Sequence, residues 1–416
     1  MKRINEFARG WKILLLAFFG VATSAAVLPL YGFGTLVVPL QEAFDWDRSE
    51  IMATTSFLTF GSIFSAQLAG WLNRRYGIRP VAILSFLGLF AAFVLLSQLD
   101  KLGDSIWLLY FGFMLLTFAG VGTLQVTWTQ VINLWFEKNR GLALAIILSG
   151  SGFMGVVLPY MITIVIDWWS WRAGFLLLAV LPVVITLPLA YFWLIDTPSQ
   201  AKSTTQKTPA ETVSMLGFSY SQGVSSWRFW VINFSMVLVA AAIMVVLINA
   251  VPMLIDKGYS AIEASQLFSV FGVSLVAGRL SVGFLVDRLW APGVAFVVIL
   301  MSALGCFLLG TVDSSTALLL VSIALIGIGA GAEFDLAAFL IARYFGMRDY
   351  ARLFGLQMGV IAAGICLAPT AVAMLYQQTG SYDVVLIVNV VLLVVGAVIL
   401  LPLGSYPVFD LEHDSD

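Results

Sequence analysis

Charged side chains are scarce in this sequence of 416 residues. Asp, Glu, Lys and Arg together make up 11% of it, whereas soluble globular domains contain about 25%. Hydrophobic residues make up 61%, and the mean hydropathy is +0.99. So few charges cannot cover the water-facing surface of a chain of this size. The composition therefore excludes a soluble globular protein and predicts an all-α integral membrane protein that crosses the bilayer many times.

Cysteine and histidine are nearly absent, with two cysteines and one histidine in the chain. Cys306 and Cys366 both fall in the middle of apolar runs, so we expect small packing residues rather than a disulfide. The histidine, His413, lies in an acidic tail. The sequence has no metal-ligand motif, no catalytic dyad and no Gly-Lys-Ser/Thr phosphate loop. We therefore expect no enzyme, no metal, no cofactor and no nucleic-acid partner.

Long apolar runs fill most of the sequence. Charges and turn residues divide them into twelve segments, most of which approach or exceed the roughly 20 residues that cross about 30 Å of hydrocarbon. We predict twelve transmembrane helices near residues 11–40, 51–72, 80–98, 106–133, 141–166, 172–195, 229–254, 262–286, 292–311, 315–342, 353–376 and 382–403.

Lysine and arginine are distributed unevenly between the two sides of the predicted membrane. With the N-terminus inside, sixteen of them fall on the cytoplasmic side, and the other side keeps four: Arg48, Lys101, Arg172 and Lys257. Because basic residues are retained on the cytoplasmic side, we predict that both termini are cytoplasmic. We expect a multi-pass protein of a plasma or inner membrane.

A polar stretch interrupts the apolar sequence between the sixth and seventh segments. It runs from Asp196 to Trp227 and includes Thr-Pro-Ser-Gln-Ala-Lys-Ser-Thr-Thr-Gln-Lys-Thr-Pro, which cannot lie in lipid. The sequence therefore predicts four parts: a six-helix bundle at 1–195, a cytoplasmic linker at 196–227, a second six-helix bundle at 228–405, and an acidic cytoplasmic tail at 406–416.

The two predicted bundles resemble each other in sequence. Trp135-Phe136 corresponds to Tyr344-Phe345, and the same offset of 209 residues carries Gly150 onto Gly359. A shorter match pairs Gly70-Trp-Leu-Asn-Arg-Arg with Gly283-Phe-Leu-Val-Asp-Arg. We therefore predict two bundles related by pseudo-two-fold symmetry. Repeats of this kind place a substrate site at their interface near mid-membrane, with alternating access by rocking.

The first copy of that short match carries a family resemblance. Gly70-Trp-Leu-Asn-Arg-Arg-Tyr-Gly-Ile-Arg resembles the loop 2–3 signature of the major facilitator superfamily, Gly-x-x-x-Asp-Arg-x-Gly-x-Arg/Lys. Arg74 occupies the Asp position, whereas Asp287-Arg288 of the second copy keeps it. The resemblance implies the major facilitator fold. It also implies that the loop acid holds the outward-facing state, a role that Arg74 cannot fill in the same way.

Two further stretches are similar to the monocarboxylate porters and their oxalate/formate-exchanger relatives within that superfamily. They are the run from Phe136 to Gly150 and Gly278-Arg279-Leu-Ser-Val-Gly283. In those porters the equivalent of Arg279 grips the substrate carboxylate. The chain differs from the animal porters at Leu275, where they have an aspartate, and by having no lysine deep in segment 11–40. It also lacks the second deep cation of the exchangers.

Arg279 is the one basic residue that hydropathy places deep in a predicted span. A charge near the centre of a bilayer costs about 2.5–3.5 kcal/mol on insertion scales, so such a residue is expected to line a protein cavity and bind something. We interpret Arg279 as a clamp for an anion. A single clamp favours a monoanion, since a second carboxylate would have no strong partner. The alternative is a permanent buried pair between Arg279 and an acid of segment 315–342.

Glu333 and Asp335 are the acids that the pattern places deep in a span. Counting about 1.5 Å per residue, their depth matches that of Arg279. A buried carboxyl near an arginine can exchange a proton when an anion arrives at that arginine. Because residues two apart lie on different helix faces, we expect one of the two to face the cavity and to couple transport to protons, and we favour Glu333 over Asp335.

Other polar or aromatic residues lie at a suitable depth for substrate contact. We predict Asn249, Gln125, Trp128, Tyr31 and Phe33 as weaker contacts, although amide and indole groups also serve as hydrogen-bond partners between helices. Charged residues at the ends of spans anchor the topology, and we further predict that some form an inner gate. The predicted gating residues are Arg75, Gly77, Arg79, Lys138, Arg140, Asp287 and Arg288.

These observations predict a secondary active transporter of small organic monoanions, coupled to protons and working by alternating access. Its expected partners are the anion, the proton and the lipid bilayer. Two alternatives stay open: an exchanger of one carboxylate for another, and a membrane sensor that binds a metabolite without moving it. The sequence does not choose among the monoanions, and it leaves the oligomeric state open.

Overall fold

The computed structural model describes residues 6–103, 105–194, 217–311, 315–379 and 382–409. Most of the predicted linker and the end of the acidic tail lie outside these residues. The described residues are mostly helical and contain no strand, apart from one isolated antiparallel bridge between Gly217 and Gly346. Helices are expected, because in hydrocarbon every backbone N–H and C=O must be paired within its own segment.

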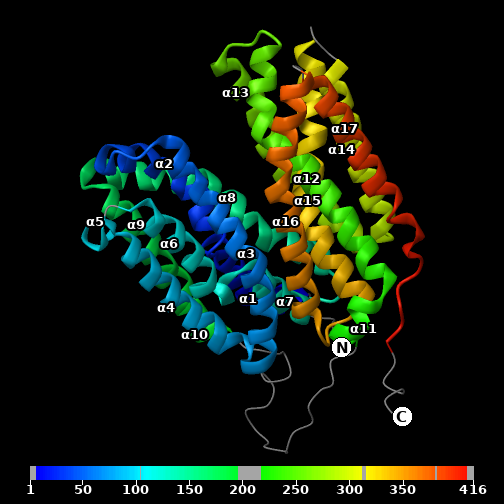
Figure 1. Cartoon of the computed structure of the whole chain (residues 1–416). Helices are drawn as coiled ribbons and strands as arrows, with labels where there is room; N and C mark the ends of the chain where they lie inside the picture. Colours follow the sequence, from blue (N-terminus) through cyan, green and yellow to red (C-terminus); the bar gives the residue numbers. More distant parts are fainter. Residues whose placement is uncertain (1–5, 104, 195–216, 312–314, 380–381, 410–416) are drawn as a thin grey trace, which may run out of the picture. The chain divides into compact units, whose positions relative to one another are not determined.

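Within the described residues, the first half of the chain contains ten α-helices, one π-helical turn and one short 3-10 turn (Figure 1). Several predicted spans are split into two or three of these pieces. They are α1 (Glu6–Ala22), α2 (Val27–Phe44), α3 (Arg48–Tyr76), α4 (Ile78–Leu96), α5 (Leu99–Leu102), α6 (Ile106–Ala119), the 3-10 turn η1 (Val121–Thr123), α7 (Gln125–Trp135), α8 (Arg140–Trp168), α9 (Trp171–Leu181), the π-helical turn η2 (Pro182–Thr186) and α10 (Leu187–Trp193).

The second half has longer, mostly uninterrupted helices, and α14 packs against both α15 and α17 (Figure 1). Its pieces are α11 (Tyr220–Ser225), α12 (Trp227–Asp256), α13 (Ala261–Val286), α14 (Ala291–Thr311), α15 (Thr316–Phe345), α16 (Tyr350–Thr379), α17 (Tyr382–Val398) and the 3-10 turn η4 (Leu401–Leu403). Capping boxes begin α11 at Ser219 and α13 at Ser260, where side-chain oxygens accept otherwise unpaired N–H groups.

Eleven of the described segments are long and apolar enough to cross a membrane. The twelfth predicted span, 106–133, is divided by Gly120 and η1 into α6 and α7. The predicted span 11–40 is likewise interrupted between α1 and α2, at residues 23–26. The sequence therefore located these spans but missed their internal breaks.

The two breaks lie against each other in a buried polar cluster. The N–H of Ala25 donates to Thr123 Oγ1 at 3.0 Å, and the N–H of Gly122 donates to Ser85 Oγ at 2.9 Å. Near the π-helical turn, the hydroxyls of Thr23 and Thr186 lie 2.7 Å apart. Hydroxyl groups thus satisfy backbone groups that the breaks release, which is the condition for irregular backbone at membrane depth.

The chain divides into two compact units, and each unit includes a short segment from the other half of the chain. The first contains residues 1–138, 146–215 and 347–359, and the second contains 139–145, 216–346 and 360–416. The predicted bundles at 1–195 and 228–405 differ from this division at two places, the first turns of α8 and the first turns of α16. Each of these helices therefore begins in one unit and continues in the other.

Candidate functional site

Arg279 lies in the second unit, on α13 and against α15. Its side chain is 6% exposed, and its Nε donates to the backbone oxygen of Gly331 at 3.0 Å. The helices approach closely here because glycines face each neighbour. A Cβ at Gly278 would overlap the backbone of Ile328, and one at Gly331 would overlap the carbonyl of Leu275. The guanidinium can therefore reach the backbone of α15.

The structure places an acid beside this arginine. Asp335 Oδ1 lies 3.5 Å from Arg279 Nε, and both side chains are buried. Gly331 and Asp335 are four residues apart and therefore share one face of α15, which explains how Arg279 meets both. The contact joins the predicted anion clamp to a predicted proton-coupling residue.

Glu333 lies on the same stretch of α15 and is 4% exposed. Within the part of the chain that the structure describes, its Oε1 has no hydrogen-bond partner. Two buried carboxyl groups and one guanidinium are thus gathered at one level of α13 and α15. If both carboxyls were ionised, one negative charge would be left over in a medium where uncompensated charge is costly.

Asn249, also in the second unit, is engaged in hydrogen bonds near one end of α12. Its Nδ2 donates to the carbonyl of Val245 at 2.9 Å, and its Oδ1 accepts from the hydroxyl of Tyr382 at 3.4 Å. The second of these bonds ties α12 to the start of α17. The substrate contact predicted for Asn249 remains a prediction, next to this structural role.

The other predicted substrate contacts lie in the first unit. Trp128 is fully buried, and its indole N–H already donates to the carbonyl of Thr123 at 3.0 Å. Its ring fills the space above Gly20, where a Cβ would overlap it. The surroundings of Trp128 thus fit a packing residue.

Phe33 of α2 is 2% exposed and packs edge-on against Phe113, with ring centroids 4.6 Å apart. Tyr31 is 36% exposed and lies beside Gly155 of α8, and Gln125, at the start of α7, is half-buried. Tyr31 and Gln125 therefore keep accessible surface, whereas Phe33 does not.

Asp287, one of the predicted gating residues, caps the start of α8. Its carboxylate accepts from the N–H of Gly141 at 2.6 Å and from that of Leu142 at 3.0 Å. The first N–H groups of a helix lack partners and favour a nearby anion. Burial raises the pKa of Asp287, while these two bonds and the charges of Arg288 and Arg140 act in the opposite direction.

Five other predicted gating residues have local contacts in the structure. Arg75 lies over the rings of Trp71 and Tyr76. Two arginines donate to backbone carbonyls: Arg79 Nη2 to Tyr191 at 2.7 Å and Arg288 Nη1 to Phe284 at 3.1 Å. The Lys138 N–H donates to Glu6 Oε1 at 3.2 Å, and Gly77 has a φ of 86° at the end of α3. Such a φ favours glycine, so Gly77 makes the tight turn into α4. Gating remains a prediction for them.

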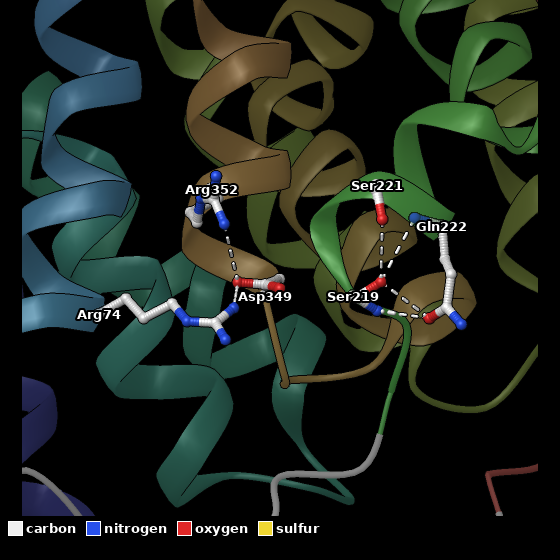
Figure 2. A network of polar contacts seen from close by, with 6 residues as sticks. All are labelled: Arg74, Ser219, Ser221, Gln222, Asp349 and Arg352. Carbon is white, nitrogen blue, oxygen red and sulfur yellow. Dashed lines mark hydrogen bonds and ion pairs between the residues drawn. The ribbon is translucent and has the colours of Figure 1, made fainter. Parts of the chain in front are cut away.

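Sequence reasoning missed Asp349, which precedes α16. Its carboxylate is 2% exposed and pairs with Arg74 of α3 and with Arg352, whose Nη1 is 3.8 Å away (Figure 2). The signal was present, because the repeat offset of 209 residues carries Arg140 onto position 349. A buried network between Asn73, Thr127 and Gln130 was also missed.

Comparison with known proteins supplies the family context of these residues. A sequence model described as "Major Facilitator Superfamily" matches residues 13–300 and 234–410. Among curated proteins, mouse monocarboxylate transporter 11 is 24% identical over 389 residues, covering 90% of this chain and 83% of the relative. Rat monocarboxylate transporter 13 is 25% identical over 401 residues, covering 95% and 89%.

Solved structures of the same fold align over nearly the whole chain. The fucose:proton symporter FucP from E. coli aligns with a TM-score of 0.71 at 13% identity, covering 96% of this chain and 100% of its own. The proton:xylose symporter XylE aligns with a TM-score of 0.74 at 15% identity, covering 95% and 96%. These likenesses confirm the predicted fold.

Proposed function

Because this chain belongs to the major facilitator superfamily, we propose that it carries a small organic monoanion of the monocarboxylate type across the membrane together with a proton. The family match and the apolar helices make it a multi-pass integral membrane transporter. The finer proposal includes alternating access, which the sequence repeat supports, and two cytoplasmic termini, which the distribution of lysine and arginine supports. The observation that carries it is Arg279, buried between α13 and α15 beside Asp335.

A single deep guanidinium supports a substrate with one negative charge. Arg279 presents a planar set of donors that matches a carboxylate, and the low dielectric of its surroundings strengthens that attraction. A dianion would bring a second charge that this guanidinium does not neutralise. Two of the most similar curated proteins are named as monocarboxylate transporters, which supports the same class of substrate.

Charge balance supports coupling to one proton. With Arg279 and Asp335 paired, an ionised Glu333 leaves the site with one net negative charge. A protonated Glu333 beside a bound monoanion leaves the same net charge. One proton can therefore accompany one anion without changing the charge held in the membrane interior, where such a change is costly. The aligned structures are described as proton symporters, in line with this coupling.

Uptake of labelled acids into proteoliposomes tests the proposal. We expect an inward proton gradient to stimulate uptake of at least one monocarboxylate, and we expect Arg279→Ala and Arg279→Lys to lower it by about 100-fold, since lysine cannot reproduce the planar contact. Arg172→Lys, at an exposed ion pair with Asp100, is the matched control and should leave uptake unchanged.

Three outcomes would count against parts of this proposal. Full activity of Arg279→Lys would remove the anion clamp and favour a permanent Arg279–Asp335 pair. Uptake that does not depend on the proton gradient but increases with the concentration of carboxylate inside the vesicles would favour an exchanger. Saturable binding of an acid without any uptake would favour a membrane sensor.

A further inference from the structure

The first turns of α16 are held on α3 by an ion pair that the sequence motif alone did not predict. Arg74, near the end of α3, pairs with Asp349, the residue before α16 (Figure 2). The backbone oxygen of Asp349 accepts from the N–H groups of Arg352 and Leu353 at 3.1 Å, so Asp349 occupies the N-cap of the helix. Its carboxylate lies where the helix dipole favours an anion.

Backbone packing brings these two helices into direct contact next to the ion pair. A Cβ at Gly70 would overlap the carbonyl of Ala351, and a Cβ at Gly355 would overlap the carbonyl of Ala66. Residues 347–359 belong to the first compact unit together with α3, whereas the rest of α16 belongs to the second. The ion pair therefore lies on the part of α16 that belongs to the first unit.

A similar set of contacts holds the first turns of α8 on α13. Cβ atoms at Gly141 and Gly283 would each overlap the other residue's carbonyl region, and Asp287 accepts from the first N–H groups of α8. Residues 139–145 belong to the second unit, whereas the rest of α8 belongs to the first. Both helices thus begin with a segment fixed by glycine packing and an aspartate.

The sequence repeat relates these two contacts and reveals that their charges are exchanged. The offset of 213 residues that pairs Gly70 with Gly283 carries Arg74 onto Asp287, and the offset of 209 carries Arg140 onto Asp349. At the first contact an aspartate follows α13 and an arginine begins α8, whereas at the second an arginine lies near the end of α3 and an aspartate precedes α16. A change at only one of the two positions would have placed like charges together, which is destabilising.

We propose that Arg74 and Asp349 form an ionic latch that fixes the first turns of α16 to α3, as the charge-exchanged counterpart of the Asp287 contact with α8. In both contacts an aspartate carboxylate lies at the start of the helix. At α8 it comes from another helix, whereas at α16 it belongs to the helix itself and Arg74 binds it. The latch rests on the alternating access of the proposed function: α3 and α16 belong to different predicted bundles, so the pair must open when those bundles move apart.

Thiol labelling of a buried position under the latch tests this proposal without any substrate. Ala351 is 3% exposed, so Ala351→Cys in a Cys306→Ser/Cys366→Ser background should react slowly with a maleimide in purified full-length protein. Arg74→Asp places two carboxylates together and should raise the labelling rate about tenfold. Adding Asp349→Asn to Arg74→Asp removes that repulsion and keeps a good N-cap residue, so the rate should return to within about twofold of the parent.

Two controls separate a latch from a general loss of stability. Arg172→Asp creates the same clash with Asp100 of α5, and it should leave labelling of Cys at position 351 unchanged. If Arg74→Asp fails to give a monodisperse protein, Arg74→Gln replaces it, and we expect the labelling rate to rise about threefold. Adding Asp349→Asn to Arg74→Gln should not raise the labelling rate further.

The latch is refuted if Arg74→Asp labels like the parent, if Asp349→Asn fails to rescue it, or if Arg172→Asp raises labelling equally. Because labelling needs no substrate, these results do not depend on which anion is carried. Conversely, loss of anion uptake in the Arg279 variants tests the substrate site and leaves the labelling result untouched.

Discussion

At the residue scale, the arrangement around Arg279 assigns different surroundings to two acids that the sequence could not separate. Asp335 shares a helix face with Gly331, and Arg279 contacts both. Glu333 lies two residues away from each on α15 and keeps an oxygen without a hydrogen-bond partner among the described residues. Asp335 is thus placed as a counter-charge, and Glu333 is left as the acid that we propose to carry the proton.

Substitution of these acids should produce two distinct defects. In Glu333→Gln we expect uptake that an inward proton gradient no longer stimulates, because the side chain keeps its size but cannot titrate. In Asp335→Asn we expect a lower unfolding temperature, since breaking one partner of a buried ion pair costs about 3–5 kcal/mol. Uptake assays and thermal unfolding in detergent measure the two effects. If uptake by Glu333→Gln still depends fully on the proton gradient, the proton-coupling role would be assigned to Asp335 instead.

At the scale of helices, glycines decide which elements meet. Gly278 and Gly331 let α13 and α15 approach until backbone contacts backbone, and Gly70 and Gly355 do the same for α3 and α16. Small residues at helix interfaces are the usual means of close packing in membranes. The charged contacts of Arg279 and of Arg74 each lie next to such a glycine pair, so their geometry depends on it.

Gly331→Ala should therefore disturb the Arg279 site without changing any charge. The added Cβ would overlap the carbonyl of Leu275, and overpacking of this kind costs about 1–3 kcal/mol. We expect an unfolding temperature several degrees lower and reduced anion uptake. Gly272→Ala on α13 is the matched control, because its Cβ would have no atom within 4 Å. If both variants unfold at the parent temperature, the glycine contact is dispensable.

At the scale of the whole molecule, the topology can be tested directly. Lys101 and Gln222 are exposed, and the lysine and arginine distribution predicts them on opposite sides of the membrane. In a Cys306→Ser/Cys366→Ser background, Lys101→Cys should react with an impermeant maleimide in intact cells. Gln222→Cys should react only after permeabilisation. The reverse pattern would invert the proposed orientation.

The predictions from sequence were most accurate where a local pattern of residues was enough to identify a feature of the protein. Apolar runs located the spans, and the residues from Gly70 to Arg79 indicated the superfamily, which the family match confirms. The breaks at 23–26 and 120–124 were missed, because they are stabilised by hydroxyls of Thr123, Thr186 and Ser85 that are distant in sequence. Asp349 was missed because its partner, Arg74, lies on another helix.

The sequence by itself determined the solvent, the helical class and the family of this protein, since a chain with 11% charged residues can satisfy its backbone in hydrocarbon only by forming helices. Tertiary structure alone decided that Arg279 meets Asp335 and that Arg74 meets Asp349. Those pairings depend on the rotation and depth of each helix, which glycine contacts between distant segments set and which no local pattern records.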